Sequence, residues 1–179
     1  SELSQTAQDV RDMRSDEDVW YGYADANSQG RSANDQGKPG TTGTTDSNGR
    51  TVVTMYTESN MESQIHETRH GGQHSRGSIN AVTQSSNVDA EVSTYRAQYS
   101  WSGSLNYMSH NFDQTTDAIR LLLNNQIRVP GSLRTINSIN QINTNMVLDI
   151  GEFYSDRSSR NLGIYVVPIY SAGTIENNN

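Results

Sequence analysis

The 179-residue chain is long enough for one domain with a buried core, and it combines a net charge of -7 with 32% hydrophobic residues and no cysteine. The acidic balance argues against nucleic-acid binding, the lack of a long apolar run argues against a membrane span, and the lack of cysteine excludes disulfides and thiolate zinc sites. Only 18% of the residues are charged, so the polarity comes mainly from Asn, Ser, Thr, Gln and Gly. This composition favours a single folded, soluble domain over residues 1–179.

The N-terminal part of the chain predicts a helix, a strand, a loop and a second strand. Apolar residues between Leu3 and Met13 recur at helical spacing, and the aromatic cluster at 19–23 predicts a strand. Residues 24–49 contain almost nothing that could be buried, so they predict a long polar loop with room for a short strand. The β-branched run at 50–57, bounded by Asn-Gly, predicts the second strand.

A polar helix is predicted directly after the second strand. It starts at the capping pattern of residues 59–62 and ends near the glycine pair at 71–72. Because successive helical residues turn by about 100°, Ile65 lies on a side that can enter the core. His66 and His70 lie roughly opposite, on a side that can face a cleft.

This helix carries the pattern HExxH, which reads HETRH in this chain. Two histidines four residues apart can bind one tetrahedral zinc ion, so His66 and His70 are predicted ligands. Glu67 can reach a zinc-bound water, whose pKa zinc lowers towards ~7, and act as the general base. The expected chemistry is amide hydrolysis. The alternative is an ordinary polar helix that matches the pattern by chance.

A third ligand is predicted on an amphipathic helix at 87–101. Glu91 lies at the edge of the stripe that we expect to be buried, whereas Asp89 points away from it. A carboxylate at the edge of a core needs a partner, which a metal ion would provide. An arginine partner or surface exposure is the alternative for Glu91. The stripe consists of Val88, Val92, Tyr95 and Tyr99.

Other polar residues could contribute to such a site. His74 is a competing third ligand, but it lies beyond two glycines and is expected to line the cleft or to be exposed. His110 is expected in a loop or at a helix start, and Tyr95 in the core or next to the ligands. Gln73 and Gln98 could hydrogen-bond the ligands and fix their tautomers or rotamers. Each of these residues could also pack without a functional role.

Two segments within residues 50–101, HETRHGGQ and EVSTYRAQYS, carry a family resemblance. They resemble the HExxH-plus-glutamate metallopeptidase domains at the C-terminal ends of RHS-repeat polymorphic toxins of Bacteroidetes-type bacteria. The resemblance to these gluzincin-like domains implies that His66, His70 and Glu91 bind Zn2+. It also implies that Glu67 is the general base.

Two residues of the same segments depart from the family pattern. Arg69 stands where the family usually has a small or apolar residue. Ser93 stands where a second acidic residue usually follows the ligand glutamate. Both departures lie on the helices that carry the predicted ligands.

The C-terminal third predicts further helices and one strand. A capped helix is expected from 113 to before the Pro130-Gly131 pair, and a second long helix or a broken pair from Leu133 to Ile150. Residues 162–170 predict a strand with Pro168 near its end or at a sheet edge.

These elements together predict an α+β fold that is mainly helical and zincin-like. A small sheet is expected to pack on the active-site helix, and in zincins the edge of such a sheet binds the substrate as an added strand. The strand Thr51–Thr57 is the candidate for this role.

The sequence supports three hypotheses for function. The first is a zinc-dependent endopeptidase that acts on a protein or peptide, as the secreted or delivered effector domain of a larger bacterial protein that could have an immunity protein. The alternative is a catalytically inactive interaction module that keeps the peptidase scaffold, with or without its zinc. The third is a surface adhesin domain, which the Asn, Ser and Thr content favours and which requires an empty histidine face.

Overall fold

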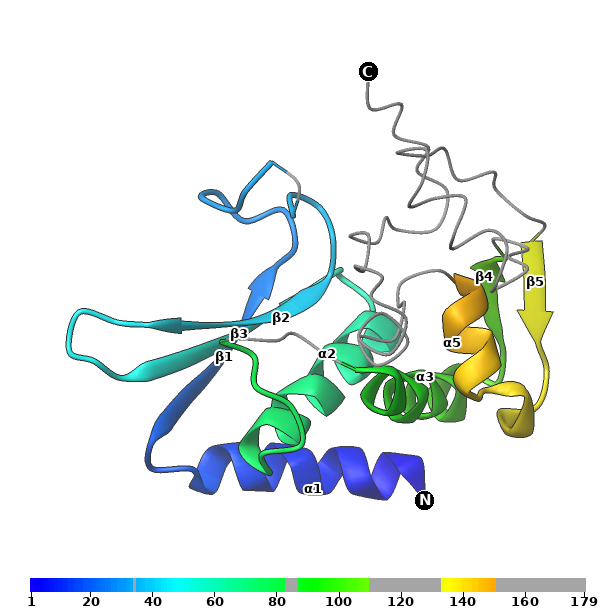
Figure 1. The fold of residues 1–179 in the computed structure, drawn as a ribbon, viewed down its shortest axis with the longest axis horizontal. Coiled ribbons are helices and arrows are strands. Elements are labelled where there is room, and N and C mark those ends of the chain that lie inside the picture. The colour runs from blue at the N-terminus through cyan, green and yellow to red at the C-terminus, as the bar shows by residue number, and fades with distance from the viewer. Residues whose placement is uncertain (34, 83–86, 110–132, 151–179) are drawn as a thin grey trace, which may run out of the picture. The chain divides into compact units, whose positions relative to one another are not determined.

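The structure is a computed structural model, and it describes residues 1–33, 35–82, 87–109 and 133–150 (Figure 1). The chain divides into two compact units, Ser1–Gly103 and Ser104–Asn179. Both units combine helices with strands, so the predicted α+β class is confirmed. The zincin-like form of the fold and the single domain over residues 1–179 stay predictions.

The N-terminal unit consists of three helices and a three-stranded sheet. In chain order these elements are α1 (Glu2–Ser15), β1 (Val19–Asp25), β2 (Gly40–Thr45), β3 (Thr51–Thr57), α2 (Met61–Ser75) and α3 (Val88–Ser102). The strands are ordered β1-β3-β2, with β3 parallel to β1 and antiparallel to β2. In the register, Val19 lies opposite Thr51 in the parallel pair, and Gly40 lies opposite Tyr56 in the antiparallel pair.

The sheet confirms two predicted strands and corrects the predicted substrate edge. The strands expected at 19–23 and 50–57 are β1 and β3, and β2 is the short strand within the polar segment 24–49. Because β3 has a partner along each edge, the prediction that Thr51–Thr57 offers an edge to a substrate is wrong. The pairing of β2 with β3 could not be predicted, because the β2 sequence GTTGTT has no alternation of apolar and polar residues.

Helix α2 is the central helix of this unit, because it contacts β3, α1 and α3 (Figure 1). Its residue Ile65 is buried, as predicted, together with Val53 and Met55 of β3 and Met13 of α1. The apolar core of the unit therefore lies around α2, and the residues that follow the HExxH pattern extend into it.

Both site helices start at asparagine caps. The Asn60 side chain accepts a hydrogen bond from the backbone N–H of Ser63 at 2.8 Å, and Asn87 accepts one from Ala90 at 2.9 Å. These bonds satisfy backbone donors in the first helical turn. The predicted start of α3 is confirmed, whereas α2 starts within the predicted pattern 59–62 but is capped by Asn60 and not by Ser59, the first residue of that pattern. Helix α3 ends at Gly103, whose φ of 74° is the left-handed conformation that glycine adopts without strain.

The predicted end of α2 at its glycine pair is wrong. The helix continues through Gly71 and Gly72 to Ser75. A Cβ atom at Gly71 would lie 2.5 Å from the sulfur of Met13, and one at Gly72 would lie 2.3 Å from Cβ of Asp9. The two glycines therefore allow α1 to pack closely on α2, and this packing offsets the roughly 1 kcal/mol that a helical glycine costs.

The described part of the C-terminal unit is a two-stranded sheet and two short helices. Its elements are β4 (Leu105–Met108), β5 (Leu133–Ile136), the 3-10 helix η1 (Ile139–Gln141) and α5 (Thr144–Ile150), with β4 and β5 antiparallel. Hydrogen bonds from the hydroxyls of Tyr107 (3.0 Å) and Ser109 (2.7 Å) to Asp149 join the β4 side of the sheet to α5.

The prediction of a long helix or helix pair from Leu133 to Ile150 is wrong at its start. Leu133–Ile136 is a strand, and among the described residues up to Ile150 it is followed by two short helical segments. The apolar residues keep a helical spacing although they span a strand and helices, so spacing alone does not distinguish them. The predicted helix from 113 and the predicted strand at 162–170 lie outside the described residues. Within the described residues, no helix is both long and apolar enough to cross a bilayer.

The glycine contact between α1 and α2 leads to a stability prediction. We expect Gly72→Ala to lower the free energy of unfolding by about 1–3 kcal/mol, because the new methyl group would overlap Asp9 and push the helices apart. Urea denaturation would measure this. Gly22→Ala is the matched control, since a Cβ there meets nothing within 4 Å. Equal stability of Gly72→Ala and the wild type would contradict the proposed contact.

Candidate metal centre

Two histidines of α2 direct the same ring nitrogen, Nε2, towards Glu91. The rings of His66 and His70 lie one helical turn apart, with 5.1 Å between their centroids. Nδ1 of His66 lies 3.1 Å from Oε1 of Gln98, and Nδ1 of His70 lies 2.9 Å from Oε1 of Gln73. An amide oxygen only accepts, so each neutral ring carries its hydrogen on Nδ1 and leaves the Nε2 lone pair for a metal. The predicted hydrogen bonds between the two histidines and Gln73 and Gln98 are confirmed, with the glutamine oxygens as acceptors.

The orientation of the Gln73 amide follows from a second hydrogen bond. Its Nε2 donates to the backbone carbonyl of Ala90 on α3 at 3.0 Å, and the side chain is buried. Because the carbonyl can only accept, the amide nitrogen of Gln73 must face α3, and the amide oxygen must face His70. Gln73 thus fixes the tautomer of one imidazole and links the two helices of the site.

Glu91 of α3 lies against both imidazoles. Its Oε2 is 3.5 Å from Nε2 of His66, and its Oε1 is 3.2 Å from Nε2 of His70. Glu91 is 7% exposed and His70 is 5% exposed, so water is largely excluded from the contact. His66, His70 and Glu91 each offer one ligand atom, and these atoms lie within 4.8 Å of one another. The structure thus brings together the three residues that the sequence singled out.

The position of Glu91 on its helix differs from the prediction. The expected stripe is only half-buried at each of its residues, and Glu91 lies within the buried face instead of at its edge. Apart from Glu91, the side chains on this face are small, and they therefore allow α3 to approach α2 closely. Asp89 is exposed, as predicted. The buried residues of α3 are Ala90, Glu91, Thr94 and Ala97.

The donor set fits a zinc ion. Two imidazole nitrogens and one carboxylate oxygen are a common ligand set of catalytic zinc, with a fourth position left for water. Ligand atoms about 2.0–2.1 Å from a tetrahedral zinc are about 3.3 Å from each other. The distance of 3.5 Å from Nε2 of His66 to Oε2 of Glu91 and that of 3.2 Å from Nε2 of His70 to Oε1 lie on either side of this value. Because they join different carboxylate oxygens, His66, His70 and Glu91 could hold zinc once the Glu91 carboxylate turns one oxygen towards both imidazoles.

The cluster holds protons more tightly than isolated histidines do. Burial lowers the pKa of His66, but the hydrogen bond to Glu91 and the charge of Glu67 outweigh it and raise the pKa above 6.5. For His70, burial is likewise outweighed, chiefly by the charge and hydrogen bond of Glu91, which raise the pKa to about 9. Burial acts to raise the pKa of Glu91, but the two imidazoles hold it well below its usual range. A zinc ion that binds here would therefore compete with protons for the two imidazoles.

Glu67, the predicted general base, points towards the sheet side of α2. It is 3% exposed, and its Oε2 accepts a hydrogen bond from the hydroxyl of Thr41 at 2.8 Å. Its charge raises the pKa of both His66 and His70, so the carboxylate is electrostatically coupled to the cluster. The contact with Thr41 could not be predicted, because Thr41 lies in the polar segment 24–49, whose sequence does not show which residues are buried.

The remaining candidates lie beside the cluster or outside the described residues. His74 belongs to α2, so the expectation that the glycines detach it is wrong. Its Nδ1 accepts the backbone N–H of Ala81 at 3.0 Å, and it is not part of the three-residue cluster. The Tyr95 ring lies edge-on to His66 with 4.8 Å between centroids. His110 lies outside the described residues.

Comparison with known proteins adds no family to this geometry. No protein-family model, curated protein or solved structure matches the chain. The resemblance to the metallopeptidase domains of RHS-repeat toxins stays a prediction, and the case for a metal centre depends on the arrangement of the residues.

The raised histidine pKa values predict how zinc binding depends on pH. We expect about one zinc per chain at about pH 7.5, with protons released on binding, because zinc requires neutral imidazoles. The pKa of His70 is raised to about 9, so its proton competes below that pH and the apparent zinc affinity falls with acidification. Bound zinc should be lost by about pH 5.

Calorimetric titration of zinc in buffers of different ionisation enthalpy would count the released protons. Failure to bind zinc at about pH 7.5, or an affinity that stays constant between about pH 9 and 5, would contradict this account of the cluster.

The geometry also predicts which carboxylate or imidazole completes the site. We expect Glu91→Ala to weaken zinc binding at least ~10 to 100-fold, since loss of even a residue that supports a ligand has this effect. Asp89→Ala and His74→Ala should change it little, because Asp89 is exposed and His74 is bonded to Ala81. Zinc titration of the three metal-free variants would decide. Loss of the metal in His74→Ala but not in Glu91→Ala would point to a three-histidine site.

Proposed function

We propose that the chain is a zinc-dependent endopeptidase that hydrolyses peptide bonds in a protein or peptide substrate. The observation that carries this proposal is the cluster of His66, His70 and Glu91, whose ligand atoms lie within 4.8 Å of one another. A general-base candidate, Glu67, lies next to a ligand in the sequence and is coupled to both histidines.

The residues of the chain have distinct tasks in this proposal. When bound, zinc would supply an acidified water and a polarised substrate carbonyl. Glu67 takes a proton from the water and returns it to the leaving amine. Thr41 orients the Glu67 carboxylate through its hydroxyl, and Gln73 and Gln98 hold the imidazoles in the tautomer that presents Nε2.

The edge of β2 is the candidate site for a substrate strand, in place of Thr51–Thr57. β2 is an edge strand of the sheet, and its residue Thr41 touches the general-base candidate. An extended peptide on this edge would gain backbone hydrogen bonds next to Glu67. Part of the edge is already in use, because the N–H of Gly43 donates to the carbonyl of Ala81 at 2.8 Å. Thr41 is itself only 5% exposed, so a substrate strand could reach Glu67 only if the chain that covers this part of β2 moves aside.

The resemblance to RHS-repeat toxin domains suggests a biological setting. In this proposal the chain is the effector domain of a larger secreted bacterial protein, and an immunity protein could protect the producing cell. The second candidate is an interaction module that binds zinc without turnover. The burial of Glu67 and its hydrogen bond to Thr41 favour this candidate, because both restrain the carboxylate that has to move a proton.

The role of Glu67 is testable by an isosteric change. We expect Glu67→Gln to keep its zinc and its fold but to lose about 10²- to 10⁴-fold in hydrolysis, because glutamine cannot take a proton. Cleavage of unfolded casein and zinc content would be measured together. Glu62→Gln is the control, since this exposed residue lies on the same helix.

The outcome separates the two candidate functions. More than about a tenth of wild-type activity in Glu67→Gln would exclude Glu67 as the base. A wild-type protein that binds zinc but cleaves no substrate would favour the interaction module.

A further inference from the structure

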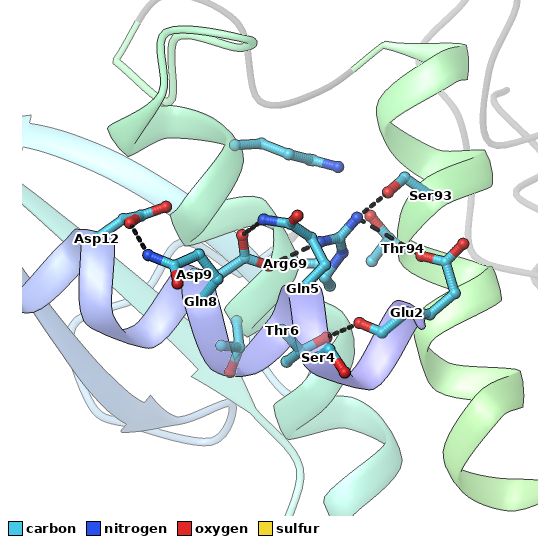
Figure 2. Close-up of polar contacts among 12 residues, drawn as sticks. Glu2, Ser4, Gln5, Thr6, Gln8, Asp9, Asp12, Arg69, Ser93 and Thr94 are labelled. Carbon is cyan, nitrogen blue, oxygen red and sulfur yellow. Dashed lines mark hydrogen bonds and ion pairs between the residues drawn. The ribbon is translucent and has the colours of Figure 1, made fainter.

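A buried ion pair joins α1 to the helix that carries both histidines. Nη1 of Arg69 lies 2.8 Å from Oδ2 of Asp9, and the two side chains are 6% and 0% exposed. Asp9 also pairs with Arg76, and it accepts a hydrogen bond from Gln5 at 3.2 Å. Because Asp9 sits against Gly72, its carboxylate is held on the surface of α2. Figure 2 shows Arg69 reaching α1 at this point.

The same guanidinium reaches α3. Nη2 of Arg69 donates to the hydroxyl of Ser93 and lies 3.8 Å from the carboxylate of Glu2 (Figure 2). Ser93 follows the predicted ligand Glu91 by two residues, and Arg69 directly precedes His70. One side chain thus links α1, the histidine helix and the glutamate helix. Arg69 and Ser93 are also the two departures from the family pattern, and here they bind each other.

An arginine is suited to this position and a lysine is not. The planar guanidinium directs its two terminal nitrogens to different partners in a fixed fork, whereas a lysine ammonium is a single point of charge. Nη1 binds Asp9 of α1, and Nη2 binds Ser93 of α3 and lies near Glu2 of α1, so the guanidinium of α2 restrains the position of α3. The position of α3 in turn sets how far the Glu91 carboxylate lies from the two imidazoles.

We propose that Asp9, Arg69 and Ser93 form a brace that positions Glu91 against His66 and His70. Through Asp9, helix α1 then helps to fix the geometry of the metal centre. These three are positioning residues, because they act through α2 and α3 and contact no ligand atom. The proposal depends on the metal centre of the proposed function and adds to it the elements that fix its geometry.

Two sets of variants of the full chain test the brace. The first is Ser93→Ala, which removes the link to α3, together with Ser93→Thr, which keeps the hydroxyl. The second is the double variant Asp9→Leu, Arg69→Met, because replacing both partners of a buried ion pair with apolar residues often leaves stability unchanged. Arg76 retains Asp12 as a partner at 3.5 Å in this variant. The controls are Ser100→Ala on α3 and Arg11→Met on α1.

Zinc affinity and the visible spectrum of the cobalt-substituted protein are the readouts, with the thermal midpoint of the metal-free protein as the measure of folding. We expect Ser93→Ala and the double variant to bind zinc about 10-fold or more weakly and to alter the cobalt spectrum, which reports coordination geometry. Ser93→Thr should restore both, and the controls should match the wild type. Folded brace variants with wild-type affinity and spectrum would overturn the proposal.

A metal-free measurement separates this proposal from the proposed function. The chain has no cysteine, so nitroxide labels can be placed on cysteines introduced at two exposed positions, Met61 of α2 and Trp101 of α3. We expect the distance distribution between the labels to broaden or shift in Ser93→Ala and the double variant, but not in the controls.

If the wild type binds no zinc, the proposed function fails, but the label distances still show whether the brace fixes the position of α3 relative to α2. Unchanged distances in the brace variants would overturn it, even if the wild type binds zinc.

Discussion

The contact of the buried Glu91 carboxylate with His66 and His70 is the interaction on which the arrangement of the N-terminal unit depends. A carboxylate with 9% of its side chain exposed is costly unless a partner compensates its charge. The partners are His66 and His70, whose pKa values are raised by Glu91 and which could coordinate zinc in their neutral form. Proton and metal would thus compensate the same charge in turn. The small residues Ala90 and Ala97 on α3 let the helices approach closely enough for this contact.

Helix α2 serves three neighbours with three different faces. Its histidines face Glu91 on α3, its Glu67 bonds to Thr41 on β2, and its glycine pair receives α1. The HExxH pattern accounts for the first two contacts only. The residues between and after the pattern, which a motif search ignores, determine how the rest of the unit is held around it. The chemistry of the motif and the packing of the helix are therefore encoded in the same fifteen residues.

Features with a local cause could be predicted from the sequence, whereas features that depend on a distant partner could not. The β-branched run of β3 and the polar residues that start α2 and α3 act within a few residues. The common face of His66 and His70 follows from helical spacing, whereas the stripe that pointed to Glu91 is only half-buried. The strand β2 is set by pairing with β3, since GTTGTT alone gives no pattern. The continuation of α2 through Gly71 depends on contacts with Met13 and Met55, and the burial of Glu91 depends on the histidines.

The central claim is that His66, His70 and Glu91 bind one zinc ion together. Anomalous diffraction at the zinc absorption edge, from crystals of the full chain grown with zinc, tests it most directly. We expect a single strong peak about 2.0–2.2 Å from Nε2 of both histidines and from a carboxylate oxygen of Glu91. A peak bound by other side chains, or no peak at this cluster while zinc is present in the crystal, would contradict the account.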